Sequence, residues 1–325
     1  MIKAERFLID LSNLKNGLMK YQNNFLNENQ VNYFYKNEYF GMPLLFPANL
    51  KYFSYDKTKF FSLKKKKFGK KIFSIKEKKY NQFENYFSYG DTFCSNIKLK
   101  NKYIKKYNFI TNYNNKLIKK IKKLKKKKLK IGSFQTRNIP HFGHERIIKH
   151  LLNFCDIAII NPLIGPKKKG DIRPNILKKV YNFLINKKFK NKVLYMPVYA
   201  NMFYAGPREA IHHVNLREKL GFDYFMVGRD HAGANNYYDK EIAMKKVKQY
   251  KKKYTLKVIA HKGSFFCSSC KKVVLKNIGS CNKKCKLKDI SGTEFRKCIA
   301  KRKIFNFADE KMQKYILQQK EKLFY

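Results

Sequence analysis

From residue 130 to residue 260 the chain alternates short apolar runs with segments of helical periodicity. This alternation predicts a doubly wound parallel sheet, so the expected fold class is α/β. In such sheets ligands bind beyond the carboxyl ends of the strands. The predicted strands are 130–134, 156–161, 192–197, 222–227 and 256–260. The predicted helices are 143–154, 174–186, one that opens at 206–207, and 238–252.

The first part of the chain has a weaker pattern. A strand-like run at 71–75 and a turn signal at 41–43 predict a small β-rich or α+β domain. The lysine-rich segment 119–130 is interpreted as a solvated helix face or a connector. We therefore expect three parts, which are an N-terminal domain at 1–115, the sheet domain at 116–289 and a small C-terminal helical segment at 290–325.

The charge of the chain is extreme, because 74 Lys and Arg against 22 Asp and Glu give a net charge of +52. A degenerate, basic nucleic-acid-binding protein is one interpretation. Compositional drift is the other, and two features favour it. The lysines are spread along the whole chain, and Arg, which nucleic-acid readers use heavily, is scarce. We therefore predict no specific nucleic-acid partner.

The opening MIKAERFLIDL does not resemble a secretory signal, and no apolar run approaches the roughly 20 residues of a membrane helix. A soluble, cytoplasmic protein without a membrane partner is expected. In that compartment, clustered cysteines suggest a metal before disulfides. Four cysteines have the spacing of two metal-binding knuckles, one with Cys267 and Cys270 and one with Cys281 and Cys285. This spacing predicts a closed, structural Zn²⁺ site within 267–285. A redox role or chance clustering is the alternative.

Segment 132–145, GSFQTRNIPHFGHE, follows a predicted strand and leads into a predicted helix. Its polar side chains suit an oxyanion, Gly143 lets the backbone approach a phosphate, and the helix N-terminus adds free N–H groups. The arrangement suits phosphoryl or nucleotidyl transfer. Two core or capping histidines are the alternative for the His pair. The candidate residues are Gln135, Thr136, Arg137, Asn138, His141 and His144.

Three further motifs carry candidate chemistry. In YAGPREA, Arg208 lies in the first turn of a helix, the wrong end for the helix dipole, which suggests a nearby anion or an ordinary surface Arg. The loop GRDHAG follows a strand and contains Gly228, Arg229, Asp230 and His231, which can contact phosphate. In ISGTEFR, Ser291 and Thr293 either cap a helix or help its N-terminus bind phosphate.

With these motifs in order, the chain resembles the sulfate adenylyltransferases (ATP sulfurylases) of the bacterial and archaeal type with a zinc knuckle. QTRN-x2-H-x2-H, YAGPREA, GRDHAG and ISGTEFR all occur, over roughly 133–302. The resemblance implies a Rossmann-like sheet domain of the HUP nucleotidyltransferase type, preceded by a PUA-like domain at 1–115. It implies the reaction of ATP with sulfate to give adenylyl sulfate and diphosphate, or its reverse in sulfur oxidation. It also implies a homodimer and Mg²⁺ with ATP.

The resemblance also implies roles for the residues. Sulfate would contact Gln135, Arg137 and the backbone N–H of Ala232. Thr136, Arg137 and Asn138 would form the catalytic trio, with Arg208, Ser291 and Thr293 in support. ATP would be held by Asn138, His141, His144, Gly228, Arg229, Asp230 and His231.

The chain departs from the family pattern in a few places. Ile139 stands between the QTRN Asn and Pro140, and the N-terminal GT-x-D segment is reduced to 89–91. In the knuckle, Cys285 replaces the His that often supplies the fourth ligand. Another HxGH-type adenylyltransferase with a different acceptor is the alternative within the same chemistry. The QTRN and GRDHAG motifs argue against it, because they supply more oxyanion contacts than ATP alone needs.

Overall fold

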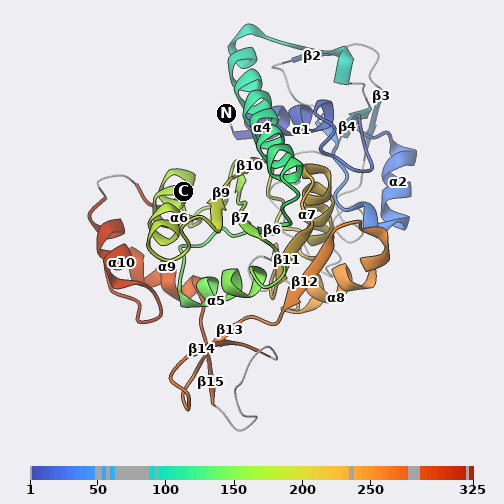
Figure 1. Cartoon of the computed structure of the whole chain (residues 1–325). Coiled ribbons are helices and arrows are strands. Elements are labelled where there is room, and N and C mark those ends of the chain that lie inside the picture. The colour runs from blue at the N-terminus through green and yellow to red at the C-terminus, as the bar shows by residue number, and fades with distance from the viewer. Residues whose placement is uncertain are drawn as a thin grey trace.

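The computed structural model describes residues 2–47, 53–55, 59–62, 88–91, 94–233, 238–276, 286–319 and 322–325. At its centre lies a five-stranded parallel sheet with the order β12-β11-β6-β7-β9 (Figure 1). The expected α/β class is confirmed, and each predicted strand is present within two residues of its predicted ends. The strands are β6 (Ile131–Phe134), β7 (Ile157–Ile160), β9 (Val193–Tyr195), β11 (Tyr224–Gly228) and β12 (Lys257–His261).

The strand order reverses between β6 and β11, which are neighbours in the sheet although far apart in sequence. The first strand, β6, continues to β7 and β9 on one side, and β11 continues to β12 on the other. Such a switch point leaves a crevice outside the carboxyl ends of the two strands. The QTRN segment follows β6 and the GRDHAG loop follows β11.

The predicted helices are also present, two of them shorter than expected. They are α5 (Phe142–Leu151), α6 (Pro174–Lys188), α7 (Pro207–Leu220) and α8 (Ile242–Gln249). Proline at the first helical position starts α6 and α7. Gly221 ends α7 in the left-handed conformation. Beyond α8 the chain tightens into a short 3₁₀ turn, η3 (Lys251–Lys253). None of the helices in the described part of the chain has the length and apolar character needed to cross a membrane.

The N-terminal part combines helices with short antiparallel strands. Strands β1, β3 and β4 form one small sheet, and β2 pairs with β5. The predicted strand at 71–75 lies outside the described residues, and the PUA-like domain stays a prediction. The elements are α1 (Ile2–Lys15), α2 (Glu28–Lys36), η1 (Glu38–Phe40), β1 (Phe46–Pro47), β2 (Phe53–Tyr55), β3 (Lys59–Ser62), β4 (Ser88–Asp91), η2 (Cys94–Asn96) and β5 (Ile97–Leu99).

A long helix, α4 (Asn101–Lys126), leads from this part to the sheet and runs across the predicted boundary at residue 115. Ile110, Leu117 and Ile121 are buried along one of its faces, at intervals close to whole helical turns. The lysines of 119–130 are exposed on the other side. The prediction of a solvated helix face is therefore confirmed for the part of this segment within α4.

The strands of the sheet bury both faces. In β7, Ile159 joins the cluster formed with α1 and α4, whereas Ala158 and Ile160 join the cluster with α5 and α6. In β11, Phe225 packs with α7 and α8, whereas Met226 joins the α5 and α6 side. Side chains alternate between the faces of a strand, so apolar residues in succession require helices on both sides.

Beyond β12 the chain forms a small antiparallel sheet and ends in two helices (Figure 1). A pair of short parallel strands, β8 and β10, lies beside the central sheet. The remaining elements are β8 (Leu163–Ile164), β10 (Val198–Tyr199), β13 (Ser264–Cys267), β14 (Val273–Leu275), β15 (Leu287–Asp289), α9 (Gly292–Ala300) and α10 (Glu310–Leu317).

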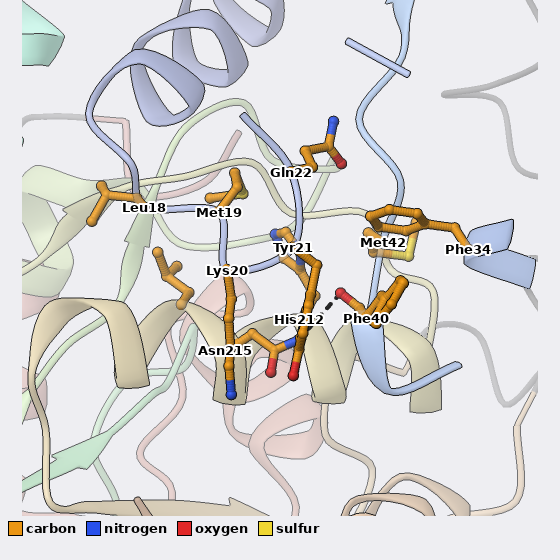
Figure 2. A pocket seen from close by; sticks show the side chains of 11 residues that line it. Leu18, Met19, Lys20, Tyr21, Gln22, Phe34, Phe40, Met42, His212 and Asn215 are labelled. Carbon is orange, nitrogen blue, oxygen red and sulfur yellow. Dashed lines mark hydrogen bonds between the residues drawn. The ribbon is translucent and has the colours of Figure 1, made fainter. Parts of the chain in front are cut away.

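The N-terminal residues meet α7 along a seam that Figure 2 shows from close by. Phe34, Phe40 and Met42 lie on one side of it, and His212 and Asn215 of α7 lie on the other. Asn215 donates to the carbonyl oxygen of Phe40 at 3.1 Å. The seam joins the N-terminal part to a helix that packs against β11 of the central sheet.

Candidate active site

A cavity of about 460 Å³ opens at the carboxyl ends of β6, β11 and β12. Every residue predicted to contact sulfate or ATP lines it, together with Ser291 and Thr293 at the start of α9. The predicted residues are Gln135, Thr136, Arg137, Asn138, His141, His144, Gly228, Arg229, Asp230, His231 and Ala232. The structure thus brings three of the four motifs, QTRN-x2-H-x2-H, GRDHAG and ISGTEFR, to one place, although they are separated by up to about 150 residues.

The turn into α5 is set by short-range hydrogen bonds. His141 is the N-cap residue, and its backbone N–H donates to Nδ1 of His144 at 3.2 Å. Gly143 is required here, because a Cβ on it would lie 2.0 Å from Ser264 Oγ and 2.8 Å from the His141 ring. The capping interpretation of the His pair is therefore correct, and the same two side chains also line the cavity.

Burial keeps these histidines uncharged. It lowers the pKa of His141 to about 3 and holds the pKa of His144 well below its ordinary value. The two rings lie 3.8 Å apart, so a charge on one would also repel a charge on the other. A neutral imidazole still donates one N–H bond, and Nδ1 of His141 is buried with no hydrogen-bond partner among the described residues. The pair can therefore offer hydrogen bonds to a ligand but no positive charge.

Arg137 is held by three neighbours. Its Nη2 donates to the carbonyl oxygen of Gly233 at 3.1 Å, and its guanidinium lies 5.4 Å from the centre of the Tyr204 ring. Nη1 lies 3.7 Å from Oδ2 of Asp171, too far for a hydrogen bond. Among the described residues this enclosed Nη1 has no hydrogen-bond partner. The guanidinium is therefore fixed in orientation and keeps donor capacity for a ligand.

Glu209 shapes the turn that carries Tyr204. Its buried carboxyl accepts the backbone N–H groups of Phe203 and Ala205, each at 2.8 Å. Tyr204 between them has a φ of 56°, which is unfavourable for a bulky residue and needs such support. Its hydroxyl donates to Asp171 Oδ2 at 2.7 Å. No sequence pattern indicates a role for Glu209, Tyr204 or Asp171, and none of them lines the cavity.

His213, a buried histidine of α7, contacts two of the residues that are predicted to bind a ligand. Nδ1 of His213 lies 3.1 Å from Nε2 of Gln135 and 3.0 Å from Nε2 of His231. Burial holds the pKa of both His213 and His231 well below the ordinary value, so both rings are neutral. Gln135 and His231 are thus oriented through one imidazole. The sequence carries no signal for His213, since it sits inside a helix beside another histidine.

The loop after β11 has an unusual backbone. Asp230 and Ala232 both have a φ of 58°, and the carbonyl oxygen of Ala232 accepts the N–H of Gly206 at 3.0 Å. Arg229 donates to both carboxylate oxygens of Asp289, at 2.6 and 2.7 Å. Both contacts come from Nη2, and this ion pair ties the loop to β15. Strained residues gathered at one loop are typical of ligand-binding sites.

The start of α9 completes the cavity wall. Ser291 caps the helix by accepting the N–H of Glu294 at 3.3 Å, as one of the two interpretations expects. Arg296 donates to Oδ1 of Asn138 and, at 3.2 Å, to Oγ1 of Thr293. Arg296 also lines the cavity. Arg296 closes the ISGTEFR motif but was not among the predicted site residues.

Arg208 lies elsewhere, which corrects the prediction that it supports the site. Its side chain is 3% exposed at the seam between α7 and the N-terminal residues. Nη1 donates to the carbonyl oxygens of Phe34 at 2.9 Å and Gly41 at 3.3 Å, and Nη2 donates to that of Tyr35 at 3.4 Å. Backbone carbonyls therefore accept its hydrogen bonds, and the anion that favours its charge is the Glu38 carboxylate of the chain itself rather than a ligand in the cavity.

The cysteine cluster lies partly outside the described residues, because Cys281 and Cys285 fall there. Cys267 is buried at the end of β13, and its sulfur accepts the N–H of Cys270 at 3.4 Å. Among the described residues no group of three or more His, Cys, Asp or Glu side chains is arranged to hold a metal. The zinc site stays a prediction.

The charge of the cavity is positive. Its described lining includes five basic residues, Arg137, Lys167, Arg229, Lys240 and Arg296, and two acidic ones, Asp230 and Asp289. The fold and the cavity together define a doubly wound α/β protein with an anion-attracting site at the switch point of its sheet.

Comparison with known proteins gives the family. The model of the ATP-sulfurylase family matches residues 111–307, more than half of the chain. The chain belongs to the ATP-sulfurylase family. It is 39% identical over 171 residues to a protein of Ignicoccus hospitalis, and 38% identical over 170 residues to one of Pyrococcus abyssi, both named sulfate adenylyltransferase. Each match covers 52% of this chain and 44% of the relative, so the chain matches less than half the length of these relatives.

A solved structure described as the hexameric APS kinase from Thiobacillus denitrificans is also similar. The similarity covers 97% of this chain and 62% of that one, with a TM-score of 0.59 and 12% identity. At that identity the likeness supports the fold alone.

Proposed function

We propose that this protein is a sulfate adenylyltransferase, which joins sulfate to the α-phosphate of ATP and releases diphosphate. One observation carries the proposal. Gln135 and Arg137 after β6, and the loop after β11, line one positive cavity at the switch point. Arg137 keeps an enclosed Nη1 without a hydrogen-bond partner among the described residues, which suits an oxyanion.

In the proposed reaction a sulfate oxygen attacks the α-phosphorus, an S–O–P bond forms, and the bond from the α-phosphorus to the diphosphate oxygen breaks. Sulfate is already an anion, so no group need remove a proton from it. Arg137 would orient sulfate and balance charge in the transition state, and Gln135 and the N–H of Ala232 would add donors. Thr136 and Asn138 complete the proposed trio, with the Thr136 hydroxyl accepting the Asn138 N–H at 3.1 Å.

ATP would lie along the rest of the cavity. Neutral His141 and His144 would donate hydrogen bonds to phosphate oxygens, and Gly228–His231 would border the nucleotide. Arg229 would meet phosphate from the same loop. Mg²⁺ would accompany ATP by bridging phosphate oxygens, as is usual for this cation.

The direct test is ATP formation from adenylyl sulfate and diphosphate, together with diphosphate release from ATP and sulfate. We expect both, each depending on Mg²⁺. Diphosphate release with another acceptor but not with sulfate would favour a different adenylyltransferase. No turnover with any acceptor, combined with salt-sensitive binding of nucleic acid, would favour the nucleic-acid-binding alternative.

For the cysteine cluster we propose a structural Zn²⁺ held by Cys267, Cys270, Cys281 and Cys285. Elemental analysis of purified protein should find about one zinc per chain, because four thiolates make a closed tetrahedral site. Cys270→Ser should lose most of it, whereas Cys298→Ser, outside the cluster, should keep it. Absence of zinc from the wild type after purification without chelators, and after added Zn²⁺, would contradict the site.

The N-terminal part is proposed to be a diverged PUA-like domain, and the active form a cytoplasmic homodimer. Light scattering of the purified protein gives its mass in solution and tests the dimer directly.

A further inference from the structure

Lys167 is a cation in the cavity that the proposed function does not use. It follows β8, and it lines the same cavity as Gln135 and Arg137. Its Nζ is enclosed by protein atoms and has no hydrogen-bond partner among the described residues. An enclosed ammonium group without a partner is costly, so a ligand that supplies acceptors would be bound favourably there.

The charges around Lys167 are mixed. The Asp171 and Glu209 carboxyls attract its proton, whereas the Arg6 and Arg137 guanidiniums repel it. Burial outweighs the carboxyls and lowers the pKa of Lys167 to about 8. At pH 7 the group is mostly protonated, and an anion brought beside it would hold the proton more firmly.

We propose that Lys167 and Arg137 together seat a tetrahedral dianion, and that Lys167 makes the site prefer dianions to monoanions of the same shape. Both residues line one cavity, and each has an enclosed nitrogen that makes no hydrogen bond within the described part of the chain. A dianion brings two charges and more acceptors to this pair, whereas a monoanion brings one charge, and the Asp171 and Glu209 carboxyls offset only part of the positive charge of Lys167, Arg137 and Arg6. The inference rests on the proposed function in that the dianion is taken to be sulfate rather than a phosphate of ATP.

The first test compares Lys167→Met with Lys169→Met, an exposed lysine two positions away. The Lys167 variant should raise the KM for sulfate about 10- to 100-fold, which is the size of a hydrogen bond to a charged group. The KM for ATP should change less than about twofold. Inhibition by selenate, a dianion, should weaken far more than inhibition by perchlorate, a monoanion. The Lys169 variant should match the wild type in all of these.

The pH dependence gives a readout that a structural role would not move. In the wild type the KM for sulfate should rise as the pH passes about 8, because free Lys167 then loses its proton. In Lys167→Met the same KM should be high and flat at these pH values. The variant keeps Arg6, Arg137, Asp171 and Glu209, so it separates the titration of Lys167 from theirs.

Binding measurements separate this inference from the proposed function. Calorimetric titration with sulfate and with perchlorate needs no turnover, and it applies even if adenylyl transfer is absent. A wild type that prefers sulfate and a Lys167→Met variant that has lost the preference support the dianion site. Unchanged sulfate binding, or a rise in the KM for ATP alone, overturns it. If Lys167→Met does not fold, Lys167→Gln takes its place.

Discussion

Replacing Arg137 with alanine is expected to lower the rate of adenylyl transfer about 10³-fold, or about 4 kcal/mol of transition-state stabilisation. The reason lies in how the side chain is held. Its contacts with Gly233 and Tyr204 fix the guanidinium before substrate arrives, while Nη1 keeps donor capacity. A group fixed in advance costs little to reorganise when charge develops beside it. Turnover at saturating ATP and sulfate measures the effect.

Two variants sharpen this prediction. Arg137→Lys keeps the charge but loses the planar fork, so it should recover only a small part of the rate. Arg146→Ala removes an exposed arginine of α5 and should leave the rate unchanged. Thermal unfolding of each variant checks that the protein is folded. A folded Arg137→Ala protein with near wild-type turnover would remove Arg137 from the proposed chemistry.

The sheet domain was predictable because its signals are local. Runs such as 157–160 and 224–228 are apolar on both faces, which only a sheet covered by helices accommodates. Proline marks the start of α7, so its beginning at 206–207 was predicted, whereas its end at Gly221 was not. Segments 135–138 and 228–232 lie after strands, and the geometry of parallel sheets then brings them to one edge.

The features that could not be predicted depend on contacts between residues that are far apart in the sequence. His213 contacts Gln135 and His231, which lie far from it in the sequence. Glu209 accepts backbone N–H groups across the turn at Tyr204. No spacing in the sequence indicates either role.

Lys167 stands in a run of three lysines, a pattern typical of solvated surface. Only burial distinguishes it from the exposed Lys169. In a chain with 74 basic residues, composition alone does not distinguish the few cations that line the cavity.

Arg208 shows how a correct local observation can lead to a wrong role. An arginine in the first turn of a helix is unfavourable for the dipole, and an anion nearby would explain it. The structure supplies the carbonyl oxygens of Phe34, Tyr35 and Gly41 from the N-terminal residues, and the Glu38 carboxylate nearby also favours the charge. Carbonyl dipoles offset the misfit as an anion would, and no sequence pattern indicates that these residues reach α7.

Arg208→Met is therefore expected to destabilise the protein by about 3 kcal/mol while leaving the KM values for ATP and sulfate unchanged. Two buried carbonyls and a partly buried one lose a charged donor, and this cost exceeds the gain from removing a buried charge. Denaturant unfolding measures the stability, and Arg146→Met, at an exposed position, should change it by less than about 0.5 kcal/mol. A stable Arg208→Met protein with a raised KM for either substrate would return Arg208 to the site. The expected result makes the seam in Figure 2 a structural joint, so that the N-terminal part supports the site through α7.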